Sequence, residues 1–230
     1  MSRTILITGA NGNLGAAVVK KFISEQYHVI AIDAANTNLA FAEGNPQYNF
    51  MSVNLTDEKA TSEFIQGIIT THKKIDGALL LVGGYSSGGI KTTDGNALKK
   101  MYSLNFETAY YPARPLFQHM SENGYGRIVF GGARPALKAE HGKEMIAYAL
   151  SKSLLFKLAE FLNEEAKGKN LVVSVIVPST IDTPANRQSM PNADPKNWVR
   201  AEQIAEILEV ICSDKGSPLR ESILKLYNNA

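Results

Sequence analysis

Short apolar runs alternate with amphipathic segments of helix length along most of this chain. Apolar runs of about four to eight residues are typical of buried strands, whereas apolar residues three and four positions apart indicate helices. Seven runs are expected to form strands: 4–7, 28–33, 48–54, 78–82, 127–130, 171–177 and 222–227. Five amphipathic segments are expected to form helices: 14–23, 58–69, 96–121, 145–167 and 202–211.

The order of these elements predicts the fold class. Strand and helix alternate about six times, which is typical of an α/β protein with helices on both faces of a parallel sheet. We expect one domain over residues 1–230, with a single-domain Rossmann fold and a doubly wound, mostly parallel, seven-stranded sheet. Right-handed crossovers bring the carboxyl ends of the strands to one rim, where ligands bind in such folds.

Some segments interrupt this pattern. Pro112 and Pro115 lie inside the expected helix 96–121, and they predict a kink there. Residues 134–143 are expected to be irregular, and residues 179–198 to form a loop rich in Pro, Asn and Ser. Asp57 is expected to cap the helix that follows it.

The first strand is followed by three glycines, Gly9, Gly12 and Gly15, and then by a helix. A glycine-rich turn at the start of a helix can hold a phosphate, because free backbone N–H groups and the helix dipole favour an anion. We expect Gly9 to allow the turn, Gly12 to allow close approach of a pyrophosphate, and Gly15 to allow close packing of helix and strand. The spacing differs from the usual G-x-G-x-x-G, and an ordinary glycine-rich turn would show the same residues.

Asp33 ends the second strand, a little over 20 residues beyond the first glycine. A carboxylate at this position typically binds a ribose 2′-hydroxyl and repels a 2′-phosphate. No Lys or Arg lies between residues 10 and 16 or between residues 33 and 46 to bind such a phosphate. Asp33 therefore predicts a preference for NAD(H), with NADP(H) possible, although a turn-forming role for Asp33 explains its position equally well.

Composition limits the classes of partner. Apolar residues make up 44 % and charged residues 20 % of the chain, as in ordinary globular proteins. A net charge of +2, with scattered Lys and Arg, argues against nucleic acid. Cys212 is the only cysteine, which excludes an internal disulfide. The four histidines lack metal-ligand spacing, so we expect no metal site and place each of them at the surface.

The chain shows neither the layout of a signal peptide nor an apolar run long enough to span a bilayer. These features predict a cytoplasmic protein without a membrane partner.

Tyr148 and Lys152 are four residues apart, so they share one face of the expected helix 145–167. A nearby ammonium favours the phenolate, so we expect Lys152 to lower the pKa of Tyr148 and to suit it for proton transfer. A tyrosine at a helix interface and a solvated lysine would give the same pattern.

Together these motifs resemble the short-chain dehydrogenase/reductase family over nearly the whole chain. The residues that carry the resemblance occur in the family's order: Thr8, Gly9, Gly12, Gly15, Asp33, Gly83, Gly84, Asn105, Tyr148, Lys152, Pro178 and Thr183. The resemblance implies an NAD(P)-dependent oxidoreductase with Tyr148 as proton donor, Lys152 on the nicotinamide ribose and Asn105 in a proton relay. It implies a cofactor-binding set that consists of Gly9, Ala10, Asn11, Gly12, Asn13, Leu14, Gly15, Asp33, Asn54, Leu55, Gly83, Gly84, Tyr148, Lys152, Pro178 and Thr183.

Two positions depart from the family pattern. The glycine spacing is a variant of T-G-x-x-x-G-x-G, and Ala133 stands where the family has its catalytic serine. The dihydropteridine reductase branch also lacks this serine, and its reaction places the proton on a ring nitrogen. Residues 182–198 and the Gly83–Gly89 loop resemble that branch, whereas Tyr85 replaces its usual Trp and Asn105 is the residue of the wider family.

The resemblance therefore implies a reductase that transfers hydride to a quinonoid dihydropterin-like or related planar small molecule. Tyr85, Ala133 and Asn186 are expected to line the substrate site, and His141 is a further candidate. The alternatives are a short-chain carbonyl or alcohol oxidoreductase of unknown substrate and a non-catalytic NAD-binding sensor, which the loss of the serine would favour. The family also implies a homodimer or homotetramer through the helices 96–121 and 145–167.

Overall fold

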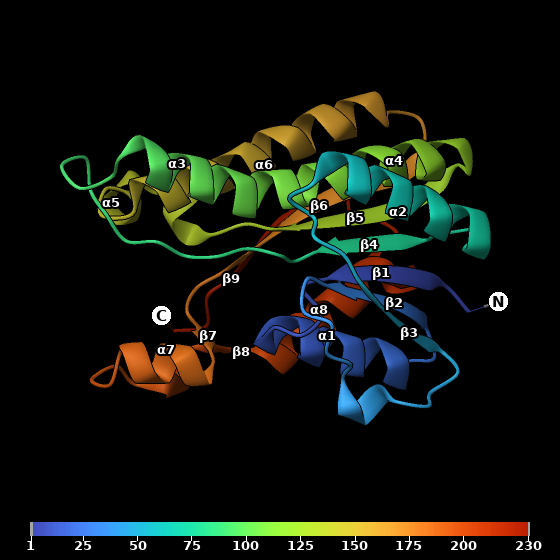
Figure 1. Ribbon diagram of the computed structural model, residues 1–230, viewed down its shortest axis with the longest axis horizontal. Helices are drawn as coiled ribbons and strands as arrows, with labels where there is room; N and C mark the ends of the chain where they lie inside the picture. The colour runs from blue at the N-terminus through green and yellow to red at the C-terminus, as the bar shows by residue number, and fades with distance from the viewer. Residues whose placement is uncertain (1, 230) are drawn as a thin grey trace.

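The computed structural model describes residues 2–229 and contains a seven-stranded sheet in which all neighbouring strands run parallel (Figure 1). The strand order is β3-β2-β1-β4-β5-β6-β9. The strands are β1 (Thr4–Thr8), β2 (His28–Asp33), β3 (Tyr48–Ser52), β4 (Gly77–Leu80), β5 (Tyr125–Gly131), β6 (Asn170–Pro178) and β9 (Ile223–Leu226). This is the doubly wound Rossmann fold that the alternation of elements predicts, and its order reverses between β1 and β4, where such folds bind ligands.

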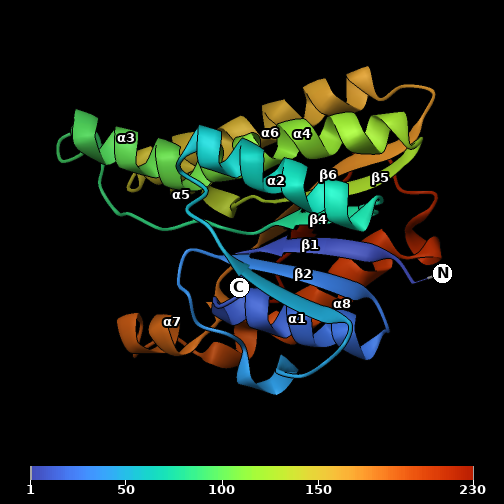
Figure 2. The same cartoon turned by 45° about the vertical axis from the view of Figure 1, so that its right-hand side comes forward.

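Helices cover both faces of the sheet (Figures 1 and 2). One layer contains α1 (Asn13–Ser24) and α8 (Ala201–Cys212), which pack against each other. The opposite layer contains α2 (Glu58–His72), α3 (Gly95–Tyr102), α4 (Thr108–Glu122) and α6 (Ile146–Glu165). None of the helices within residues 2–229 combines the length and the apolar character needed to cross a bilayer.

Strands covered on both faces explain the continuous apolar runs. Successive side chains of a strand point to opposite faces. In β1, Leu6 therefore joins the apolar cluster under α2, α4 and α6, whereas Ile5 and Ile7 join the cluster under α1 and α8. All three side chains are fully buried, so each face of the sheet has a core that holds the carboxyl ends of the strands in place.

The long helix expected over 96–121 is interrupted at a different place than predicted. A π-helical turn over Ser103–Glu107 separates α3 from α4, whereas Pro112 and Pro115 lie inside α4. The helix therefore continues through both prolines, and the interruption expected there lies at the π-turn instead. π-helices occur mostly as single turns inside α-helices and are frequent at functional sites, and this one carries Asn105.

The segments expected to be irregular contain short elements. Residues 134–143 include η3 (Arg134–Ala136) and α5 (Ala139–Gly142). Residues 179–198 were expected to form a loop, but they contain β7 (Ile181–Asp182), α7 (Pro184–Ser189) and η4 (Pro195–Asn197). The strand β7 pairs with β8 (Val199–Arg200). The Thr183 hydroxyl oxygen accepts from the Asn186 N–H and caps α7, a local signal that the sequence contained. Two more 3₁₀ turns are η1 (Ala40–Ala42) and η5 (Asp214–Gly216).

Candidate active site

The glycine turn after β1 forms an open cradle at the start of α1. Gly9 adopts a φ of +70°, and its carbonyl accepts a 3.1 Å hydrogen bond from the Gly12 N–H. A Cβ on Gly15 would lie 2.0 Å from the Gly9 oxygen, so only glycine fits there. Gly12 caps α1 without a side chain. The first N–H groups of a 12-residue helix therefore face the cradle, as binding of a phosphate requires.

Asp33 lies beside this cradle at the end of β2. Its two carboxylate oxygens accept hydrogen bonds of 3.0 Å from the backbone N–H groups of Asn11 and Ala35. The Asn11 side chain donates to the Thr37 carbonyl at 2.8 Å, while its own Oδ1 is buried and has no hydrogen-bond partner among residues 2–229. Remaining acceptor capacity on Asp33 fits the hydroxyl groups of a ribose.

Two other residues expected to bind the cofactor, Asn54 and Leu55, lie just after β3. The Val53 N–H donates to the Asp33 carbonyl at 3.0 Å, which brings the end of β3 next to the cradle. Leu55 is 4 % exposed and packs in the core, so only its backbone is available to a ligand. The Asn54 side-chain oxygen accepts from both the N–H and the hydroxyl of Thr56, which orders the turn after β3.

Lys152 reaches the rim of the sheet from α6. Its Nζ donates to the Gly131 carbonyl at 2.7 Å, at the end of β5. Burial of the ammonium lowers the pKa of Lys152 to about 8, because a low-dielectric surrounding disfavours the charged form. A Cβ on Gly83 would lie 2.8 Å from this Nζ, so the loop after β4 passes directly over Lys152.

The environment of Tyr148 corrects one expectation. Burial raises the pKa of Tyr148 to about 12, and the neighbouring Tyr85 phenol adds to the shift. We expected Lys152 to lower this pKa, and that direction was wrong for the protein alone. The Lys152 ammonium is bound to the Gly131 carbonyl, whereas the ring of Tyr148 packs against Tyr85, with centroids 5.3 Å apart and planes at 68°.

Asn105 connects three elements of the site. Its Oδ1 accepts from the Gly84 N–H at 2.8 Å, and its Nδ2 donates to the Ser151 hydroxyl at 3.0 Å. Ser151 in turn donates to the Tyr148 carbonyl at 2.8 Å. Asn105 is fully buried. The π-turn thus joins the loop after β4 to the turn of α6 that carries Tyr148 and Lys152.

The three residues expected to line the substrate site, Ala133, Tyr85 and Asn186, differ in exposure and in side-chain contacts. Ala133 follows β5, is 4 % exposed, and presents only a methyl group. Tyr85 is 64 % exposed above Tyr148. The Asn186 side chain donates to the Ile181 carbonyl at 2.8 Å, so it orders its own turn. Pro178 pairs with Leu226 at the end of β6, and Thr183 caps α7 five residues later.

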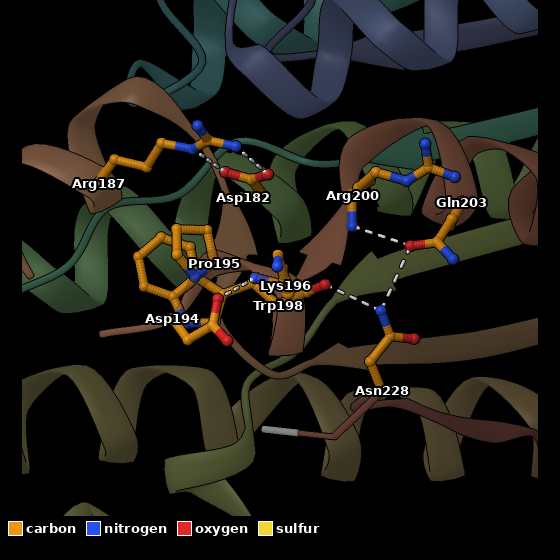
Figure 3. Close-up of a pocket in the computed structure, with 9 residues that line it drawn as sticks. All are labelled: Asp182, Arg187, Asp194, Pro195, Lys196, Trp198, Arg200, Gln203 and Asn228. Carbon is orange, nitrogen blue, oxygen red and sulfur yellow. Dashed lines mark hydrogen bonds and ion pairs between the residues drawn. The ribbon is translucent and has the colours of Figure 1, made fainter. Parts of the chain in front are cut away.

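Two features were not predicted from the sequence. Arg134 follows Ala133, stacks on the Tyr227 ring at 5.3 Å and lies 3.2 Å from Nε2 of His141, which brings His141 to the same rim. A cavity of about 490 Å³ also lies against α7, where Asp182 forms two hydrogen bonds with Arg187 (Figure 3). Its lining residues are Asp182, Arg187, Asp194, Pro195, Lys196, Trp198, Arg200, Gln203 and Asn228. Their separation in the chain left no local signal.

A family model described as "short chain dehydrogenase" matches residues 3–194 of this chain. The chain belongs to the short chain dehydrogenase family. It is an NAD(P)-dependent oxidoreductase of that family.

Curated relatives include the "Dihydropteridine reductase" of Dictyostelium discoideum, which is 28 % identical over 98 % of this chain and 94 % of its own length. The "7alpha-hydroxysteroid dehydrogenase" of Bacteroides fragilis is 26 % identical over 80 % of this chain and 73 % of its own length.

Solved structures share the fold. "4-hydroxyisoleucine dehydrogenase complexed with NADH" has a TM-score of 0.87 at 23 % identity and covers 99 % of this chain and 98 % of its own. "ElxO with NADP Bound" has a TM-score of 0.90 at 18 % identity, with 98 % and 97 % covered. The names of these two neighbours thus include NADH in one case and NADP in the other.

Proposed function

We propose that this short-chain enzyme is a reductase similar to dihydropteridine reductase, which transfers hydride to a quinonoid dihydropterin-like or related planar substrate. The observation that carries the proposal is the meeting of Tyr148, Lys152 and Asn105 at a rim where Ala133 supplies no hydroxyl. The likeness to the Dictyostelium protein over nearly the full length of both chains supports this choice of substrate.

Each residue of the rim has a separate task in this proposal. When bound, the nicotinamide cofactor supplies the hydride. Tyr148 keeps its proton at neutral pH, because its pKa lies near 12, and donates it to the reduced substrate. Lys152 stays protonated below about pH 8 and binds ribose hydroxyls with the N–H groups that Gly131 does not use. Asn105 holds the loop and the helix that carry these groups.

We infer a preference for NADH over NADPH from the second strand. The Asp33 carboxylate is fixed by the N–H groups of Asn11 and Ala35, and it would face the 2′-position of the adenosine ribose. A fixed negative charge binds a 2′-hydroxyl and repels a 2′-phosphate.

The direct test is NADH oxidation, followed by absorbance, with quinonoid dihydropterin as the acceptor. Wild type is expected to turn over, and Tyr148→Phe is expected to lose about a hundredfold or more in kcat while it still binds NADH. The matched control is Tyr110→Phe, a half-exposed tyrosine on α4. Absence of turnover in wild type with tightly bound NADH would contradict the proposal.

A carbonyl or alcohol oxidoreductase is the second candidate. Asn105 is the residue of the wider family, and the exposed Tyr85 departs from the Trp that is usual in the dihydropteridine reductase branch. Relatives named as steroid, acyl-carrier-protein and sugar-acid enzymes support it. The same NADH assay with a panel of ketones separates the two: a kcat/KM for a ketone at least tenfold above that for quinonoid dihydropterin would favour this candidate.

We also infer self-association through α3, α4 and α6. A shallow apolar groove of about 360 Å³ lies between α3 and α6, and large apolar side chains are exposed along these helices. They are Leu98, Tyr102, Tyr110, Leu150, Leu154 and Phe161. An exposed patch of this kind marks an interaction surface. Light scattering is expected to give the mass of a dimer or tetramer, and Leu150→Lys with Leu154→Lys to give a monomer.

Two further proposals concern the whole chain. We propose that residues 1–230 form a single reductase domain, because both apolar clusters pack on one sheet. We propose a cytoplasmic location, which is in keeping with Cys212 as a buried free thiol. Limited proteolysis tests the first proposal, and fractionation of cells tests the second.

A further inference from the structure

The rim lacks the hydroxyl that the family's serine would supply. Ala133 ends the strand region with a buried methyl group, and the preceding Gly132 N–H is used by the Ile176 carbonyl at 2.8 Å. Tyr148 is therefore the one hydroxyl that the family's usual constellation retains here. Tyr148 donates a proton to one atom of the substrate. A carbonyl oxygen or imine nitrogen beside that atom needs a second hydrogen-bond donor, which holds the substrate in one orientation.

Tyr85 brings another phenol to the same place. Its ring meets the Tyr148 ring edge to face, with centroids 5.3 Å apart. Within residues 2–229 the Tyr85 hydroxyl has no hydrogen-bond partner, and the side chain is 64 % exposed. The two phenols also interact electrostatically, since Tyr85 contributes to the raised pKa of Tyr148. An uncommitted donor thus lies beside the proton donor.

The backbone on both sides of Tyr85 is held in place. The preceding Gly84 N–H donates to Asn105 at 2.8 Å. Three residues after Tyr85, the Gly88 N–H donates to the Glu144 carbonyl at 2.8 Å and the Gly88 carbonyl accepts from the Ile146 N–H at 2.9 Å. Tyr85 is therefore anchored both to the π-turn and to the start of α6, and the loop can hold its hydroxyl in one region of the rim.

We propose that the Tyr85 hydroxyl takes over the task of the missing serine and donates a hydrogen bond to a carbonyl oxygen or imine nitrogen of the substrate. The inference rests on the proposed reductase function and deepens it. Tyr85 keeps its own proton throughout, since Tyr148 supplies the one proton that accompanies the hydride. The Tyr85 ring additionally offers a face or edge to a planar substrate, so the preferred substrates are flat, conjugated molecules that carry a hydrogen-bond acceptor.

The test separates the hydroxyl of Tyr85 from its ring. Tyr85→Phe keeps the ring and removes the donor, so kcat is expected to fall about tenfold to a hundredfold while KM changes by less than about threefold. Ala133→Ser restores a donor at the family position, so the Tyr85→Phe/Ala133→Ser variant is expected to regain at least tenfold. Tyr48→Phe at the first position of β3, the strand end opposite the rim, is the matched control and should match wild type.

The inference requires both the loss of kcat in Tyr85→Phe and its recovery in Tyr85→Phe/Ala133→Ser. An unchanged kcat in Tyr85→Phe overturns the inference, and so does a loss of activity that Ala133→Ser leaves unrepaired. These outcomes differ from failure of the proposed function, in which wild type reduces neither quinonoid dihydropterin nor a ketone.

A second measurement needs no turnover. Calorimetric titration of the NADH-bound enzyme with oxidised pterin, a planar ring with a carbonyl group, is expected to show about fivefold weaker binding to Tyr85→Phe and recovery in the double variant. Equal pterin affinity of wild type and Tyr85→Phe would overturn the inference even if the enzyme reduced no pterin.

Discussion

The side-chain oxygen of Asn105 accepts a 2.8 Å hydrogen bond from the backbone N–H of Gly84. The two residues lie 21 positions apart, on the π-turn and on the loop after β4. The bond fixes the loop that passes over Lys152, while the amide nitrogen of Asn105 binds Ser151 beneath Tyr148. One buried side chain therefore sets the relative positions of the loop and α6.

Replacing Asn105 by Ala should affect both stability and catalysis. The change leaves a buried N–H and a buried hydroxyl without this partner, which costs about 2 kcal/mol in the free energy of unfolding. It should also lower kcat at least tenfold, because the loop and Tyr148 lose their common anchor. Asn163→Ala is the matched control, since Asn163 bonds both backbone groups of Val173 away from the rim. Urea unfolding measures the change in stability, and the NADH assay measures kcat. An equal loss of kcat in both variants would contradict this role of Asn105.

Asp33→Asn should weaken the discrimination between the two cofactors. In the amide an NH2 group replaces one of the two oxygens and faces the N–H of Asn11 or Ala35, and the amide no longer repels a 2′-phosphate. We expect NADH affinity to fall about tenfold and the NADH-to-NADPH preference to shrink by at least that factor. Fluorescence titration with each cofactor measures this. Asp57→Asn, at the cap of α2, should leave the preference unchanged; a similar shift there would argue against a specific role of Asp33.

Gly15→Ala and Gly67→Ala should act in opposite directions. A Cβ on Gly15 would lie 2.0 Å from the Gly9 oxygen, so the cradle must deform and cofactor binding should be lost. A Cβ on Gly67 in α2 meets nothing within 4 Å, and alanine should stabilise the helix by about 0.5–1 kcal/mol. Thermal unfolding with and without NADH compares the two. Normal NADH binding by Gly15→Ala would show that the cradle tolerates the side chain.

NADH binding should weaken as the pH rises through about 8. Burial lowers the pKa of Lys152 to about 8, so its positive charge is lost on the alkaline side of that value. The neutral amine still bonds Gly131 but no longer attracts the ribose hydroxyls strongly. Fluorescence titration between pH 6 and pH 10 should show this step in wild type. In Lys152→Met the affinity should be uniformly low, and an identical step in that variant would assign the titration to another group.

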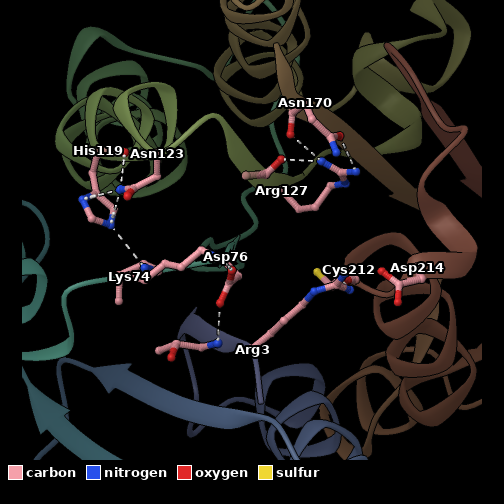
Figure 4. Close-up of polar contacts among 12 residues, drawn as sticks. Arg3, Lys74, Asp76, His119, Asn123, Arg127, Asn170, Cys212 and Asp214 are labelled. Atoms are coloured by element: carbon pink, nitrogen blue, oxygen red, sulfur yellow. Dashed lines mark hydrogen bonds and ion pairs between the residues drawn. The ribbon is translucent and has the colours of Figure 1, made fainter. Parts of the chain in front are cut away.

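His119 should make the folded state sensitive to acid. Its Nε2 accepts a 3.2 Å hydrogen bond from the Ile75 N–H, and burial lowers the pKa of His119. Figure 4 shows the His119 ring beside Asn123. The unfolded chain binds the proton more readily below its ordinary pKa of about 6.5, so the free energy of unfolding should fall as the pH drops below that value.

Urea unfolding of His119→Gln between pH 5 and pH 8 tests this dependence. The glutamine oxygen can accept from the Ile75 N–H without titrating, so the acid sensitivity should diminish. His28→Gln at an exposed position of β2 is the control and should leave the pH dependence as in wild type. If His119→Gln retained the full dependence on pH, the proton uptake would belong elsewhere.

Much of the fold was determined by local sequence. The run from His28 to Asp33 forms β2 with the predicted bounds, because a strand buried on both faces needs a continuous apolar run. Asp57 caps α2 through the Ala60 N–H, as a carboxylate before a helix does. The glycine cradle follows equally local rules, since Gly9 needs a positive φ and Gly15 needs the absence of a Cβ.

The tertiary structure decided the chemistry of the rim. Spacing put Tyr148 and Lys152 on one face of a helix, but burial and the remote Gly131 carbonyl set the pKa values and the direction of the lysine. His119, expected at the surface, is 8 % exposed because α4 packs it against Ile75. Asn105, Tyr85 and the π-turn meet only in the folded chain. Hydrophobic periodicity and helix caps depend on residues only a few positions apart. The hydrogen-bond partners and the burial of the ionisable side chains depend on segments that only the fold brings together.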